Sequence, residues 1–379
     1  MRARLLLLGL MLTAPSLAAQ SSMFGVRGLG LPGRELSARA LGSDGAIGLF
    51  DPESSLNPAS ISGLGVLTAG FALTPDWRTW SSPAGNASLR ATRFPLAYVG
   101  GPVPGSRLSL AIGFASYADH DFALASVGTF SPRGQAVTYY DTLTSTGGLS
   151  QFRFAAAYRL DDATTIGAAA YAITGSNRVI THRYFSDSSY LPILQRTEMS
   201  YAGPGFSLGL THRFSSAFSG ALLLRSDGAA KLDIDSTRVG TIDLPYTFGA
   251  GFTYRASRKL QLAGQGIYQT WSGANSDLLA LGGVGSVNTL DVSAGLEFTP
   301  DPRRPTRHPL RFGVRYAGLP FPLEAGARAH EFSIATGTGA RFARGRGGMD
   351  LGLQYAWRSD GSARKERALL LTLGISVRP

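Results

Sequence analysis

The stretch that decides the fold is Arg107-Leu108-Ser109-Leu110-Ala111-Ile112-Gly113-Phe114-Ala115-Ser116-Tyr117. Large apolar residues alternate here with Gly, Ala and Ser over about ten positions, which is the length and the two-residue period of a tilted membrane-spanning strand. The segments 218–225 and 349–357 repeat the pattern, and aromatic residues stand near the segment ends, as in the girdles at the two membrane interfaces. The pattern therefore predicts an all-β fold, a transmembrane antiparallel β-barrel.

About fourteen segments carry this alternation, and an even strand number is usual in single-chain bacterial barrels. The predicted strands are 64–74, 91–101, 107–118, 149–160, 164–176, 197–213, 218–234, 241–255, 260–271, 289–299, 310–318, 329–342, 348–358 and 366–378. The connections alternate between short turns, at 102–106, 161–163, 215–217 and 343–347, and long loops, at 75–90, 119–148, 177–196 and 272–288. Short turns face the periplasm in such barrels and long loops face the exterior, so we expect both termini on the periplasmic side.

A soluble all-β protein, such as a propeller or tandem sandwiches, is the alternative fold. It would bury large side chains on one strand face and repeat with a period of about 40 residues or more. The chain has no such period, and the alternation partner is often Gly, Ala, Ser or Thr. Only 16% of the 379 residues are charged, whereas a typical soluble domain has roughly 25%. Both observations favour the membrane barrel.

The composition also limits the function. The chain has no Cys, which excludes disulfides and thiolate metal sites, and its five histidines lack the spacing of metal ligands. The net charge of +11 comes from arginines scattered along the chain, whereas a nucleic-acid binder concentrates its charge on one face or helix. We therefore expect no metal centre, no cofactor and no nucleic-acid partner.

Residues 1–19 have the features of a secretory signal peptide. Arg2 and Arg4 precede the apolar run 5–12, and small residues follow up to Ala19. The apolar run is too short to span a bilayer as a helix. An exported chain of this composition is expected in the bacterial outer membrane, with residues 64–379 forming the barrel.

Three motifs of catalytic or metal-binding type are interpreted as structural. The sequence Gly205-Phe206-Ser207-Leu208-Gly209, with His212 nearby, matches the nucleophile elbow of a lipase but lies within a predicted strand instead of a strand–turn–helix unit. Residues 28–33 match the dinucleotide fingerprint in letters only, because no βαβ unit surrounds them. Residues 119–121 are interpreted as a polar loop. No catalytic residue and no enzymatic activity are predicted, and an outer-membrane lipase is the enzymatic alternative.

The segment before the first predicted strand resembles a known family. Residues 39–47 and 51–59, which contain Arg39, Gly45 and the sequence Asn57-Pro58-Ala59, resemble the N-terminal hatch of FadL-type outer-membrane transporters of long-chain fatty acids and other hydrophobic compounds. In that family an Asn-Pro-Ala ends the hatch just before the first barrel strand. The segments 244–251, 269–272 and 310–316 look like further family segments in the same order.

The resemblance implies a fourteen-stranded barrel whose lumen is plugged by residues 20–63, with a hydrophobic passage beside the plug. It implies uptake of hydrophobic small molecules such as long-chain fatty acids. The implied partners are outer-membrane lipids and the barrel-assembly machinery, and the implied oligomeric state is a monomer. By position and character, Met23 and Phe24 are candidates to reach into the ligand pocket. A structural or secretion-accessory barrel that transports nothing is the alternative function.

Two predicted loops carry apolar residues that would be costly in water unless they shelter a ligand or one another. The first loop contributes Tyr190, Leu191, Ile193 and Leu194, and the second contributes Leu278, Leu279 and Leu281. We interpret them as an outer capture groove, and their mutual packing as a lid is the alternative interpretation.

Overall fold

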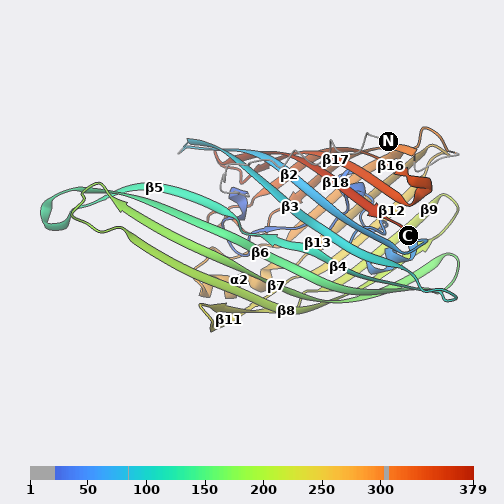
Figure 1. Cartoon of the computed structure of the whole chain (residues 1–379), viewed down its shortest axis with the longest axis horizontal. Helices are drawn as coiled ribbons and strands as arrows, with labels where there is room; N and C mark the ends of the chain where they lie inside the picture. Colours follow the sequence, from blue (N-terminus) through green and yellow to red (C-terminus); the bar gives the residue numbers. More distant parts are fainter. Residues whose placement is uncertain (1–21, 84, 303–306) are drawn as a thin grey trace, which may run out of the picture.

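The computed structural model describes residues 22–83, 85–302 and 307–379, so the expected signal peptide lies outside the described residues. Fourteen antiparallel strands form a closed barrel, in which β18 pairs with β2 (Figure 1). In order around the wall they are β2 (Thr68–Ser82), β3 (Gly85–Pro102), β4 (Leu108–Asp119), β6 (Val137–Arg159), β7 (Thr164–Phe185), β8 (Ile193–Arg213), β9 (Phe218–Ser226), β12 (Tyr246–Arg255), β13 (Leu260–Gln269), β14 (Thr289–Phe298), β15 (Arg307–Gly318), β16 (His330–Phe342), β17 (Gly347–Ser359) and β18 (Lys365–Val377).

The remaining elements are short and lie inside the barrel or beyond its wall. The extra strands are β1 (Leu31–Pro32), β5 (Phe122–Phe130), β10 (Ala229–Ile234) and β11 (Thr237–Asp243). The helical turns are η1 (Met23–Gly25), α1 (Ala38–Leu41), η2 (Pro58–Gly63), η3 (Pro132–Gly134), η4 (Trp271–Ala274), α2 (Asn275–Ala280) and η5 (Ala343–Gly345). Within the described residues, no helix is long and apolar enough to cross a membrane.

The predicted fourteen-stranded barrel is confirmed, but three of the predicted long loops are wrong. Residues 75–90, 119–148 and 177–196 are largely strand, and β5, β6, β7 and β8 extend far beyond the rest of the wall (Figure 1). β6 and β7 pair without a break from Tyr139↔Phe185 to Arg159↔Thr165. These extensions could not be predicted from the sequence, because a sheet that is exposed on both faces has no reason to alternate apolar with polar residues.

The predicted strand 218–234 is also wrong, because the chain leaves the wall after Ser226. Gly228 adopts a positive φ of 63°, and the β10–β11 hairpin then continues beside β8 before β12 returns to pair with β9. The predicted strand 241–255 likewise divides into the end of β11 and β12. A glycine at a left-handed position is the local signal for such a break.

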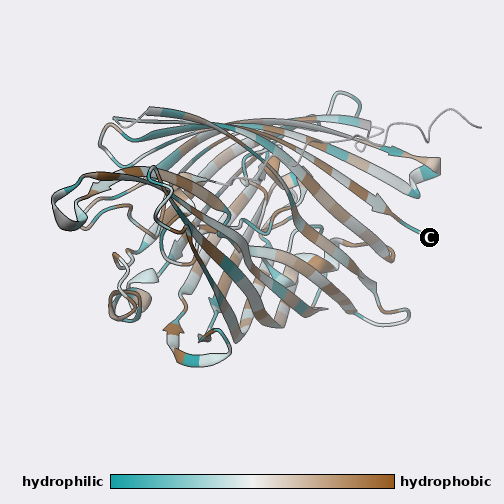
Figure 2. Ribbon diagram, turned by 60° about the vertical axis from the view of Figure 1, so that its left-hand side comes forward, coloured by the Kyte–Doolittle hydropathy of each residue, from teal (hydrophilic) through white to brown (hydrophobic). Residues whose placement is uncertain are grey.

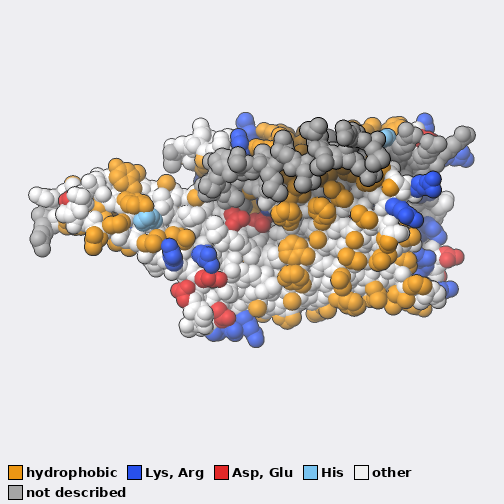
Figure 3. All heavy atoms as spheres, viewed as in Figure 1, with side chains coloured by type: hydrophobic (Ala, Val, Ile, Leu, Met, Phe, Trp, Pro, Cys, Tyr) orange, Lys and Arg blue, Asp and Glu red, His pale blue; other side chains and the backbone are white. Residues whose placement is uncertain are grey.

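The wall has an apolar outer face and a polar inner face. Apolar and polar residues alternate as bands along the strands (Figure 2), and apolar side chains cover the middle of the barrel surface (Figure 3). Outward-facing Ile112, Phe154 and Phe206 are more than half exposed, as lipid-facing side chains must be in the isolated chain. We call the end of the barrel that carries the short connections and the C-terminus the turn end, and the opposite end the loop end.

Residues 22–63, which we call the N-terminal segment, lie inside the barrel where the wall presents glycines. A Cβ atom on Gly209 would lie 1.9 Å from Asn57 Oδ1, and one on Gly313 would lie 2.0 Å from the carbonyl oxygen of Ser43. The wall can therefore approach the N-terminal segment this closely only without side chains at these positions.

Candidate functional site

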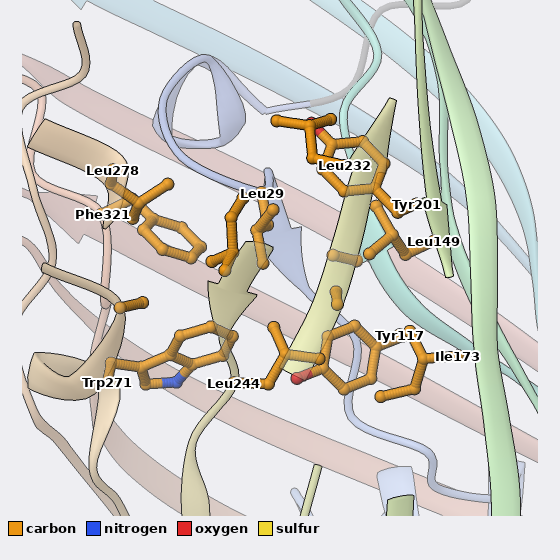
Figure 4. Packing of buried hydrophobic residues seen from close by; sticks show 14 of the residues in the cluster. Leu29, Tyr117, Leu149, Ile173, Tyr201, Leu232, Leu244, Trp271, Leu278 and Phe321 are labelled. Carbon is orange, nitrogen blue, oxygen red and sulfur yellow. The ribbon is translucent and has the colours of Figure 1, made fainter. Parts of the chain in front are cut away.

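An apolar cluster lies inside the loop end of the barrel, and we call it the apolar vestibule (Figure 4). Leu29 of the N-terminal segment lies between Phe321 and Leu232, and the ring of Trp271 meets the ring of Phe321 edge-on at 5.0 Å. Its buried members are Leu29, Tyr117, Ala118, Leu149, Tyr171, Ile173, Tyr201, Ala230, Leu232, Ile242, Leu244, Trp271, Ala274, Leu278 and Phe321. Because these residues come from the N-terminal segment, the wall and three connections at the loop end, a greasy molecule arriving from that end would meet an apolar surface there.

A cavity of about 180 Å³ lies beside the apolar vestibule. Gln269 lines this cavity, and its Oε1 accepts a hydrogen bond of 3.2 Å from Trp271 Nε1 in the vestibule. The apolar part of the cavity wall includes Leu31, Leu36, Leu41, Leu56, Ile267 and Leu319. Polar residues and charged residues of the strands and of the N-terminal segment, such as Arg93, Arg315 and Glu35, also line it, so the cavity offers both apolar surface and charge to one ligand.

Most of the strand charges at the cavity belong to a continuous row of ion pairs on eight adjacent strands, from β4 through β2 and β18 to β14, which we call the charge ladder. Its successive members are Asp119, Arg93, Asp76, Arg78, Glu366, Arg358, Glu331, Arg315 and Asp291. Arg93 binds Asp119 and Asp76 at 2.6 Å each, and Arg315 binds Asp291 at 2.8 Å. Since nearly every charge has two neighbours of opposite sign, the ladder can stay ionised although it is buried.

Removing one charge from the ladder should destabilise the barrel strongly. Glu331→Gln leaves the buried guanidinium groups of Arg315 and Arg358 without their shared carboxylate, so we expect a loss of roughly 3 to 5 kcal/mol in the free energy of unfolding. Asp141→Asn is the matched control, because its pair with Arg183 is partly exposed and should contribute little. Urea titrations monitored by tryptophan fluorescence measure the free energy of unfolding of both variants. Equal losses of stability in the two variants would contradict the stabilising role of the charge ladder.

At the cavity and from there toward the turn end, polar contacts hold the N-terminal segment to the wall. Glu35 accepts hydrogen bonds of 2.6 Å from both Arg225 and Gln151, and Glu53 pairs with Arg341 at 2.9 Å. Burial raises the pKa of Glu53, the nearby Asp51 carboxylate adds to this rise, and the Arg341 guanidinium opposes it. In the same segment, burial lowers the pKa of Arg34, and repulsion by Arg315 adds to it. This network holds the N-terminal segment against the inner face of the wall.

The wall has a break between β3 and β4 at the level of the cavity. The two strands pair from Pro102↔Ser109 only as far as Leu96↔Ala115, although β4 continues to Asp119. Pro95 cannot donate to the ladder, and the β2–β3 register shifts opposite it, between Ala72 and Thr74. Pro95 and Ser116 both line the cavity, so the cavity reaches the wall at this break.

Strand β1 of the N-terminal segment covers the break. Leu31 pairs with Asp119, Pro32 pairs with Ala118, and the N–H of Gly33 donates to the carbonyl oxygen of Tyr117 at 2.8 Å. Gly30 and Gly33 flank the strand, and a Cβ atom on either would lie 2.2 Å or less from a β4 carbonyl oxygen. β1 therefore occupies the edge of β4 that β3 leaves free.

The structure places the predicted ligand-binding residues in three different regions. Leu278 belongs to the apolar vestibule, whereas Leu279 and Leu281 on the same turn are exposed. Phe24 is buried against Trp80 at 5.5 Å, and Met23 packs on the same cluster. The first loop group lies at the tip of the extended β7–β8 region, where Tyr190 packs on Phe130 and Phe185 while Leu191, Ile193 and Leu194 are exposed, and none of them joins the vestibule.

The predicted plug residues all contact the wall or fix the N-terminal segment internally. Arg39 lies 3.5 Å from Glu297, and Gly45 has a φ of 92°. Asn57 is fully buried, caps η2 by accepting from the N–H of Ala59, and donates to the carbonyl oxygen of Leu49. Pro58 and Ala59 lie against Gly167 of β7.

Sequence reasoning missed the charge ladder and most of the apolar vestibule. The ladder residues could have been found, because they occupy the strand face opposite to the lipid-facing residues. The vestibule could not, because Leu29 and Phe321 lie in segments without a periodic pattern, and Leu232 lies in the segment 218–234 that is predicted as one continuous wall strand.

No protein-family model matches the chain, and no curated protein matches it. Among solved structures, a Pseudomonas aeruginosa FadL homologue is similar to the chain with a TM-score of 0.63 and 11% identity, over 92% of this chain and 99% of that one. The Ralstonia pickettii toluene transporter TbuX is similar with a TM-score of 0.55 and 15% identity, over 92% and 99%. The Pseudomonas putida toluene transporter TodX has a TM-score of 0.53 and 12% identity, over 95% and 98%. The chain therefore has the fold of FadL-type outer-membrane barrels.

Proposed function

Because the chain has this fold, we propose that it is a bacterial outer-membrane channel for the passive uptake of hydrophobic small molecules. One observation carries the proposal: the apolar vestibule adjoins a cavity that reaches a break in the barrel wall. The named transporters of toluene and the FadL homologue support the same class of cargo. The turn end then faces the periplasm, the outer face contacts membrane lipids, and the channel acts as a monomer.

The route has three steps in this proposal. A hydrophobic molecule adsorbs to the vestibule around Trp271 and Leu278, moves into the cavity, and leaves sideways between β3 and β4 when β1 shifts. The N-terminal segment acts as the plug that blocks a direct path through the lumen to the turn end. Its ion pairs with wall residues such as Arg225 and Arg341 favour a sideways exit, since a route through the segment would have to break them.

The cavity also bears on the chemical class of the cargo. Arg93 and Arg315 stand on its wall beside apolar side chains, so an amphiphile with an anionic head, such as a long-chain fatty acid, is favoured over a plain hydrocarbon. The carboxylate of the fatty acid would replace a ladder carboxylate as the partner of one of these arginines, while the tail contacts Leu36 and Ile267.

Uptake by cells that lack other hydrophobic-compound channels tests the function. We expect production of the chain to raise the initial rate of uptake of radiolabelled oleate several-fold, that of toluene less, and that of arabinose not at all. Trp271→Ser should remove most of the gain, because it replaces the largest fully buried apolar side chain of the vestibule by a polar one. Leu191→Ser at the exposed tip is the matched control. Equal uptake with and without the chain would reject the proposal and favour a structural or secretion-accessory barrel.

A further inference from the structure

Four arginines stand at the turn end of the barrel on one arc of its wall, at the ends of β4, β6, β8 and β12. They are Arg107, Arg159, Arg213 and Arg255. In β8 and β12 the residues of the same parity face the lumen, since Gly209 lies against Asn57 and Gly251 lies against Leu49 of the N-terminal segment. Because side chains alternate along a strand, Arg213 and Arg255 lie on the lumen-facing side of the wall, at its rim.

None of these four arginines is paired with a carboxylate within the described part of the chain. Arg107 donates to the carbonyl oxygen of Leu160 at 2.7 Å, and Arg213 donates to that of Asp162 at 2.7 Å. Arg159 and Arg255 make longer contacts, to the carbonyl oxygens of Ser62 at 3.4 Å and Ser216 at 3.5 Å. Each guanidinium is thus anchored by one N–H to the backbone and keeps other donors for a ligand.

Two of these arginines also face each other directly. The N–H of Arg159 donates to the carbonyl oxygen of Arg107 at 3.0 Å, so the two residues lie opposite each other at the ends of β4 and β6. Like charges in directly opposite positions destabilise a sheet, and among the described residues neither arginine is paired with a carboxylate. A bound anion would offset the repulsion between them.

The opposite arc of the same mouth is arranged differently. Arg341 and Arg378 lie 2.9 and 3.7 Å from Glu53, and Arg311 lies 2.7 Å from Glu297. These three arginines are therefore neutralised by carboxylates of the chain itself. Unlike these three, the four arginines on the arc from β4 to β12 have no carboxylate partner within the described residues.

A polar cavity of about 410 Å³ lies between the two arginines of β8 and β12. Besides Arg213 and Arg255 it is lined by Ser216, Ala217, Ser219, Thr253 and Gln261, all without negative charge. A water molecule occupies about 30 Å³ of liquid, so the cavity has room for a phosphate group and several waters. Two guanidinium groups with hydroxyl donors between them match the oxygens of a phosphate.

We propose that the pocket between Arg213 and Arg255 at the turn end of the lumen binds a phosphate-type anion. The anion is either free phosphate or the headgroup of an anionic phospholipid. This site is separate from the apolar vestibule and the cavity beside it, so it does not depend on the proposed uptake of hydrophobic compounds.

Binding of inorganic phosphate and of phospholipids to the purified full-length barrel tests the site. Calorimetric titration in a nonionic detergent is expected to give a saturable phosphate isotherm, and Arg213→Gln/Arg255→Gln is expected to raise the Kd by roughly tenfold or more. Arg213→Lys/Arg255→Lys keeps the charge without the planar fork and should recover part of the affinity. Arg90→Gln/Arg196→Gln is the matched control, because these exposed arginines lie at the loop end.

Native mass spectrometry with phosphatidylglycerol and phosphatidylcholine separates the two sources. Retention of phosphatidylglycerol without a phosphate isotherm assigns the site to a lipid headgroup, and the reverse assigns it to the free anion; both support the site if the Gln variant abolishes them. Heat-modifiable electrophoretic mobility verifies that each variant is folded. The site is overturned if the folded wild-type barrel binds neither probe, or if the Gln variant and the control variant bind equally well.

Discussion

Oxidation of a Pro32→Cys/Ala118→Cys variant is expected to reduce oleate uptake to the background of cells without the channel, and a reductant is expected to restore it. Pro32 and Ala118 are paired in register, and the hydrogen bond from Gly33 N–H to the Tyr117 carbonyl makes the next pair, 32 and 118, non-hydrogen-bonded. Such pairs bring Cα atoms to about 4.5 Å, which a disulfide can bridge. The bond would hold β1 on the edge of β4 and close the break in the wall.

Because the chain has no Cys, only the two introduced thiols can form a disulfide in this variant. Ala356→Cys/Ala368→Cys is the matched control, because it joins two buried, paired alanines of β17 and β18 away from the break. Oxidation of the control should leave uptake unchanged. Full uptake by the oxidised Pro32/Ala118 variant, with the disulfide verified by mass spectrometry, would contradict a sideways exit gated by β1.

Gly313→Val is expected to displace the N-terminal segment and open the lumen to water. Its Cβ atom would lie 2.0 Å from the carbonyl oxygen of Ser43, which is backbone and cannot rotate away. Movement of this region would also break the hydrogen bonds that the neighbouring Asp44 accepts from Ser333 and Gln354. Since a barrel of this size without a plug can hold an aqueous channel, we expect single-channel conductance in planar bilayers to rise by roughly tenfold or more.

The control for this substitution is Gly266→Val, because a Cβ atom at Gly266 of β13 meets nothing within 4 Å. Conductance of this variant should match that of the unchanged protein. A Gly313→Val barrel that is folded and still closed would show that the N-terminal segment does not block the lumen. Gly209→Val, directed at Asn57, provides a second and independent displacement.

The parts of the fold that the sequence predicts best are those that lie within the membrane. In β17 and β18 the lipid-facing side chains must be apolar and the lumen-facing ones small or polar, so the predicted 348–358 and 366–378 match Gly347–Ser359 and Lys365–Val377 closely. Beyond the membrane this constraint ends. The outer halves of β6 and β7 therefore carry no period from which their ends could be predicted.

The candidate site is harder to predict because its residues converge from segments far apart in the sequence. Leu278 is predicted to bind ligand from its apolar character alone. It reaches the vestibule only because η4 and α2 fold over the barrel mouth. The same criterion selected Leu191, which is 83% exposed at the tip of the extension. Apolar character thus identifies residues with a reason to avoid water, whereas tertiary contacts decide which of them share a site.

A hydrophobic molecule is expected to occupy the loop end of the lumen, and native mass spectrometry with lipid extraction measures this most directly. Barrel purified from outer membranes in a mild detergent is predicted to retain a fatty acid or another hydrophobic compound, and Trp271→Ser is predicted to lose it. The Leu191→Ser control should retain the same compound. An empty barrel in all three preparations, each verified as folded, would contradict the binding of a hydrophobic compound in the apolar vestibule.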